Sequence, residues 1–76
     1  MDFLDVKRTV EKAKRDGKES VVLVFKPDSE YARNGKNKEE VKISDVANIW
    51  ERDRVVFFDA LGFELNAIKE ISREIR

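Results

Sequence analysis

The chain contains no cysteine and no histidine. Without cysteine there are no disulfide bonds and no thiol nucleophiles, and without histidine the usual general base is missing. Zinc sites built from these two residue types are excluded as well. We therefore expect a protein that is not an enzyme and that holds no metal and no small-molecule cofactor.

The chain also lacks an excess of charge of one sign, and it lacks long apolar runs. The 16 Lys and Arg residues cancel the 16 Asp and Glu residues, which argues against coating nucleic acid by bulk electrostatics. The longest apolar run covers residues 21–25 and is too short to span a membrane, and the acidic start is unlike a secretory signal. These features favour a cytoplasmic location and no membrane partner.

The length of 76 residues predicts one domain covering residues 1–76. A domain of this size buries only about 60% of the surface of its unfolded chain. Since no disulfide bond can help, stability has to come from packing or from a partner subunit.

The first third of the chain has clear patterns. Residues 2–16 are expected to form a helix, because Phe3, Val6, Val10 and Ala13 recur at helical spacing. Residues 20–26 are mostly β-branched or aromatic and predict a strand that is covered on both faces.

The polar segment 28–40 has two interpretations. Asn34-Gly35 is a strong hairpin signal, which favours a turn between a ragged strand near Tyr31 and a strand entering Val41 and Ile43. The alternative is a loop without regular structure.

The secondary structure of residues 44–53 also has two interpretations. We favour a long, bulged strand over residues 41–50 that turns at Arg52-Asp53. The alternative is a helix over 44–52 that buries Val46, Ile49 and Trp50.

The last third predicts a hairpin and a second helix. Residues 54–60 and 63–65 are expected to be strands joined by a tight turn at Leu61-Gly62, with Phe57 in the core. A short helix over 66–76 would be capped by Asn66, with Ile68, Ile71 and Ile75 on one stripe. The alternative extends the last strand through Ile68.

Together these elements predict an α+β fold with a small antiparallel meander, an N-terminal helix and a short C-terminal helix. This order resembles that of the small SH3-like and Sm-like barrels. The Arg-Gly turn of the Sm family is missing at residues 59–62, so no Sm binding residue is transferred. With a helix at 44–52, the sheet would instead be partly parallel.

The segment 31–38 is the best candidate for binding nucleic acid. It holds three cations, no acid and one aromatic ring that could stack on a base of RNA or single-stranded DNA. The candidate residues are Lys26, Tyr31, Arg33, Lys36 and Lys38.

The apolar residues favour a different function. Strands that are apolar on both faces need cover from a second helix, from barrel closure or from another subunit, and Leu4 and Leu61 fall outside the expected core stripes. Our first hypothesis is therefore a non-enzymatic module that acts through protein–protein contacts, with a protein partner or as a homo-oligomer. Nucleic-acid binding by residues 31–38 is the alternative. A metal-assisted hydrolase that uses Asp59 and Glu64 is the third and weakest hypothesis, because no acidic cluster accompanies them.

Overall fold

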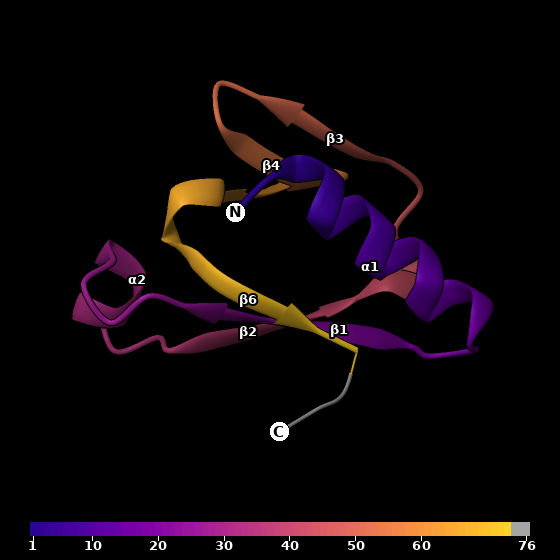
Figure 1. Ribbon diagram of the computed structural model, residues 1–76, viewed down its shortest axis with the longest axis horizontal. Helices are drawn as coiled ribbons and strands as arrows, with labels where there is room; N and C mark the ends of the chain where they lie inside the picture. The colour runs from indigo at the N-terminus through magenta and orange to yellow at the C-terminus, as the bar shows by residue number, and fades with distance from the viewer. Residues whose placement is uncertain (74–76) are drawn as a thin grey trace.

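The computed structural model describes residues 1–73, an α+β arrangement of an N-terminal helix and six antiparallel strands in two three-stranded sheets (Figure 1). The helices are α1 (Phe3–Arg15) and the short α2 (Glu30–Arg33). The strands are β1 (Ser20–Phe25), β2 (Lys38–Lys42), β3 (Ile49–Arg52), β4 (Val55–Phe58), β5 (Leu61–Glu64) and β6 (Ile68–Ser72).

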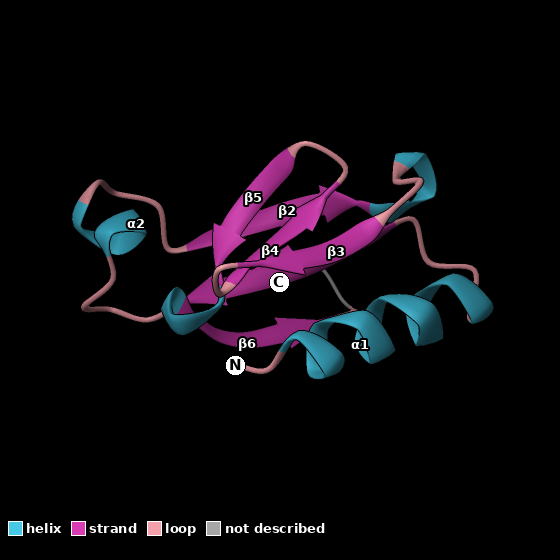
Figure 2. Cartoon of the chain, turned by 90° about the horizontal axis from the view of Figure 1, so that it is seen from above, coloured by secondary structure: helices cyan, strands magenta, loops and turns pink. Residues whose placement is uncertain are grey.

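Two short 3-10 turns carry the chain from one sheet to the other. The strand orders are β2-β1-β6 and β3-β4-β5. Residues Ile43–Asp45 lead from β2 to β3, and Leu65–Ala67 lead from β5 to β6 (Figure 2). Ile43 and Leu65 are fully buried, so each crossing places an apolar side chain in the core.

The core lies between the two sheets and α1. The helix contacts β1, β3 and β6 and buries Val6, Val10 and Ala13, as the spacing predicts (Figure 1). The predictions for the first helix and the first strand are thus confirmed within one residue at each end. The rest of the buried cluster comes from the strands and turns: Val21, Leu23, Phe25, Val41, Ile43, Val56, Phe58, Phe63, Leu65 and Ile68.

The expected strand near Tyr31 is wrong. Tyr31 lies in α2, whose first turn is capped by Ser29, since the Ala32 N–H donates to Ser29 Oγ at 3.2 Å. Asn34-Gly35 ends this helix rather than turning a hairpin, with Gly35 at a φ of +87°. The strands on either side, β1 and β2, do pair antiparallel.

Neither interpretation of residues 44–53 is correct. The favoured strand over 41–50 is broken between Lys42 and Ile49, and the alternative helix is reduced to the 3-10 turn. The carboxylate of Asp59 accepts from the backbone N–H groups of Ala47 and Asn48 at 2.9–3.2 Å, which removes both donors from any strand ladder.

The end of the chain differs most from expectation. Leu61 and Gly62 belong to β5, and the turn lies at Asp59-Ala60, where Asp59 has a φ of 57°. Instead of a helix over 66–76, residues 68–72 form β6, because β1 offers a free edge on which Leu23 pairs with Ile71. The alternative of a last strand running through Ile68 is also wrong, since the turn Leu65–Ala67 interrupts it. Ile75 of the expected stripe lies outside the described residues.

Within residues 1–73, none of the helices has the length and apolar character that crossing a bilayer requires.

The turn between β3 and β4 stores backbone strain. Asp53 and Arg54 both have positive φ, 51° and 65°, which is the pattern of a type I′ turn and favours Asn-Gly. We expect Asp53→Gly to stabilise the fold by about 0.5–1 kcal/mol, because glycine adopts this conformation without steric cost. Little is lost with the side chain, whose ion pair with Arg52 spans 3.8 Å between groups that are 76% and 91% exposed.

Thermal unfolding checks this expectation. Asp45→Gly is the control, because Asp45 is similarly exposed and lies in a 3-10 turn with negative φ. If Asp53→Gly lowers Tm, as Asp45→Gly is expected to do, the backbone at Asp53 is not strained.

Candidate interaction face

The sheet β3-β4-β5 has an inner face in the core and an outer face with its own apolar cluster. On β4, Val56 and Phe58 are buried in the core, while Val55 and Phe57 point to the opposite side and are only half-buried. The pairing of β4 with β3 and β5 places six residues in two rows on this side. We call them the outer face: Trp50, Phe57 and Gly62 in the first row, Arg52, Val55 and Glu64 in the second.

An aromatic stack occupies the first row. The rings of Trp50 and Phe57 lie 4.2 Å apart between centroids and 11° from parallel. The Trp50 Nε1–H donates to the Asp59 carbonyl at 3.1 Å, which fixes the indole against the hairpin. Trp50 is nevertheless 41% exposed. The expectation that Phe57 belongs to the core is wrong, because its ring packs on Trp50 outside the buried cluster.

Gly62 provides the space in which the Phe57 ring lies. A Cβ at Gly62 would stand 2.7 Å from Phe57 Cε1 and 3.0 Å from Val55 Cγ1. Glycine is thus required here by close approach and not by φ. It lets the aromatic stack lie close to the sheet.

The second row has charges of opposite sign at its two ends. Arg52 pairs across the sheet with Val55, and Val55 pairs with Glu64 on its other side. The two charged side chains therefore stand about 10 Å apart on the outer strands, with an apolar residue between them. This arrangement of an apolar centre and a charged rim is typical of protein interfaces.

The proposed nucleic-acid residues differ in how far the fold already engages them. The Tyr31 ring stacks on Phe25 at 4.3 Å, and its hydroxyl accepts from the Glu64 N–H at 3.1 Å. Lys36 forms an ion pair with Glu39 at 2.5 Å. Arg33 is exposed on α2, and Lys38 begins β2. One face of the aromatic ring is therefore already used in packing.

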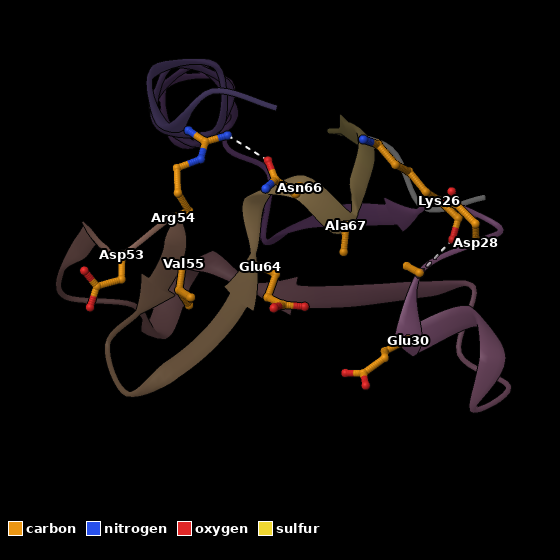
Figure 3. A pocket seen from close by; sticks show the side chains of 10 residues that line it. Lys26, Asp28, Glu30, Asp53, Arg54, Val55, Glu64, Asn66 and Ala67 are labelled. Carbon is orange, nitrogen blue, oxygen red and sulfur yellow. Dashed lines mark hydrogen bonds between the residues drawn. The ribbon is translucent and has the colours of Figure 1, made fainter.

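Lys26 is the one of the five that lines the hollow shown in Figure 3. The hollow has a volume of about 430 Å³ and lies beside the outer face, with Val55 and Glu64 in its wall. Its lining carries more carboxylates than cations, and Lys26 and Arg54 stand on opposite sides (Figure 3). The arrangement does not suit a phosphate group.

The Arg54 guanidinium in this hollow is already engaged. Its Nη2 donates to Asn66 Oδ1 at 2.9 Å and to the Met1 carbonyl at 3.4 Å. These bonds hold the chain start against the turn before β6. Asn66, expected to cap a helix, instead accepts the first of these bonds with its side-chain oxygen on that turn.

The other candidate residues, Leu4, Leu61 and Asp59, do not belong to the two rows of the outer face. Leu4 on α1 and Leu61 on β5 are 56% and 52% exposed. The Asp59 carboxylate binds backbone N–H groups, and residues 1–73 contain no group of three acidic side chains arranged for a metal ion. The contribution of Leu4 and Leu61 to an interface stays a prediction.

Sequence reasoning missed the outer face as a site. The signal was present in the strand 55–58, where apolar residues occupy both faces. The two apolar faces indicate a surface that needs cover, but Phe57 is expected in the core and only Leu4 and Leu61 are named for the interaction surface.

Comparisons with family models, with curated proteins and with solved structures find no match for this chain.

Proposed function

We propose that the protein is a non-enzymatic interaction module that binds a protein partner through the outer face of β3-β4-β5. One observation carries this proposal. Trp50 and Phe57 form an apolar cluster that is separate from the core, and Trp50 keeps 41% of its surface exposed. A tryptophan held by a ring stack and a hydrogen bond has little side-chain entropy left to lose on binding, and tryptophan is enriched at binding hot spots.

The chemistry of the outer face and of the segment 31–38 favours a protein partner over nucleic acid. The outer face carries one cation and one anion around its aromatic centre, so it has no excess positive charge for phosphates. The segment 31–38 has the cations, but its tyrosine is packed on Phe25 and bonded to β5.

We also propose that the two sheets are halves of a small SH3-like or Sm-like barrel. The element order supports this, because both 3-10 turns carry the chain directly between the sheets. Such barrels leave the outer side of each sheet free for contacts, which agrees with the proposed role of the outer face.

Selection of peptides tests the function without knowledge of the partner. A random 12-residue peptide library is displayed against the immobilised protein, and enriched peptides are measured against Trp50→Ser. We expect this variant to weaken binding at least ~10-fold, which is the loss of one hot-spot side chain. Arg8→Ser removes a large exposed side chain on α1, outside the outer face, and should leave binding within about twofold.

The proposal fails if no peptide is enriched and the chain also stays monomeric at high concentration. It fails equally if enriched peptides bind Trp50→Ser as well as they bind the unchanged chain. Circular dichroism of each variant confirms that it is folded before binding is measured.

A further inference from the structure

The outer face is complementary to itself. Its two rows run across β3, β4 and β5 in that order: Trp50–Phe57–Gly62 and Arg52–Val55–Glu64. In the second row, the residues on the two outer strands carry opposite charges, a cation on β3 and an anion on β5. In the first row, the Phe57 ring already fills the space beside Gly62.

From this pattern we infer that the partner bound by the outer face is a second copy of this chain. We place a two-fold axis between two such faces, parallel to β4. With this axis, β3 of one protomer lies opposite β5 of the other. Arg52 then faces Glu64 of the second copy, and Glu64 faces Arg52 of the second copy. Val55 and Phe57 meet their own counterparts at the centre.

The charges select this axis over the perpendicular one. An axis across the strands would place the second row on the first, so that Glu64 would face the Gly62 of the second copy. The carboxylate would then lie against an apolar surface without a partner, at a cost in desolvation. With the axis along β4, each charged group faces a group of opposite charge. The interface is then isologous, as a closed dimer requires.

The small size of the face limits the strength of the dimer. Three strands of four residues present much less than the roughly 800 Å² per partner of a standard stable interface. Self-association is therefore expected only at high protein concentration, and the measurement has to reach about 1 mM.

Variants with reversed charges at the two facing positions provide the test. Arg52→Glu places carboxylates against carboxylates, and Glu64→Arg places cations against cations. In sedimentation equilibrium at about 1 mM, each single variant should lower the association constant at least ~10-fold. An equimolar mixture of the two variants should restore it to within about threefold of the unchanged chain. The reason is that carboxylates at both positions of one variant then face guanidinium groups at both positions of the other.

Arg8→Glu and Glu19→Arg are the matched controls. They make the same charge changes at exposed positions on α1 and before β1. We expect neither variant to change self-association by more than about twofold, alone or in the mixture, once repulsion is screened by about 0.1 M salt.

This inference rests on the proposed function, but the two can fail separately. A monomer at about 1 mM, or single variants without rescue in the mixture, overturns the second copy as the partner. Peptide binding that depends on Trp50 would in that case still support the outer face as a docking surface. If both experiments fail, the outer face is not a binding site.

Discussion

Replacing Leu23 with alanine is expected to destabilise the protein by about 3–5 kcal/mol. Leu23 is fully buried in β1, the central strand of β2-β1-β6, and pairs with Glu39 on one side and Ile71 on the other. Removing a fully buried leucine side chain loses its transfer free energy and leaves a cavity that the two neighbouring strands cannot fill. For a domain of this size, the loss approaches the whole free energy of unfolding.

Urea denaturation followed by circular dichroism measures this effect. Val24→Ala is the matched control in the same strand, because Val24 points to the opposite face and is only partly buried, so its truncation should cost less than about 1.5 kcal/mol. Where Leu23→Ala does not fold, Leu23→Val still has to cost more than Val24→Ala. A cost of Leu23→Ala below about 1 kcal/mol contradicts the placement of β1 at the centre of the core.

Replacing Gly62 with alanine is expected to cost about 1–3 kcal/mol, although alanine suits a strand better than glycine does. The added Cβ would stand 2.7 Å from Phe57 Cε1, so the ring has to move. Because Trp50 stacks on that ring, the displacement should also disorder the indole and weaken its near-ultraviolet circular dichroism.

Two comparisons separate this steric effect from backbone strain. Gly17→Ala meets no atom within 4 Å but has a φ of +75°, so it costs only the conformational penalty of about 1 kcal/mol and leaves the tryptophan signal unchanged. In a Phe57→Ala background, most of the cost of Gly62→Ala should disappear, because the clashing ring is gone. Additive costs would show that Gly62 is not constrained by Phe57.

The sequence predicted the elements whose patterns are local. The helix over residues 3–15 follows from apolar spacing that one face of one helix explains, and β1 follows from a run of β-branched residues. The antiparallel α+β class also follows, because short connections leave few other ways to pair the strands.

The missed elements depend on contacts between distant residues. Residues 68–72 have an isoleucine spacing that fits a helix, but the free edge of β1 provides a ladder of backbone hydrogen bonds for a strand. The break between β2 and β3 depends on Asp59, which binds the N–H groups of Ala47 and Asn48 from a turn more than ten residues away. Single-sequence patterns carry no information about either contact.

The same limit applies to the candidate site. Tyr31 was assigned to a nucleic-acid surface from its cationic neighbours in sequence, whereas its neighbours in space are Phe25 and the backbone of Glu64. Phe57 was assigned to the core because it is aromatic and lies in a strand. Only the pairing of β4 with β3 and β5 reveals which of its two faces is open.

The most direct test of the outer face as the binding surface is an amide NMR titration of the labelled protein. One series adds the enriched peptide, or concentrated unlabelled protein, and a parallel series adds a short single-stranded RNA at low salt. We expect the first series to shift the Trp50 indole and the amides of Val55, Phe57 and Gly62, and the RNA series to leave the spectrum unchanged. Shifts confined to residues 31–38 that appear with RNA and fade with added salt would contradict the account and assign the function to the basic segment.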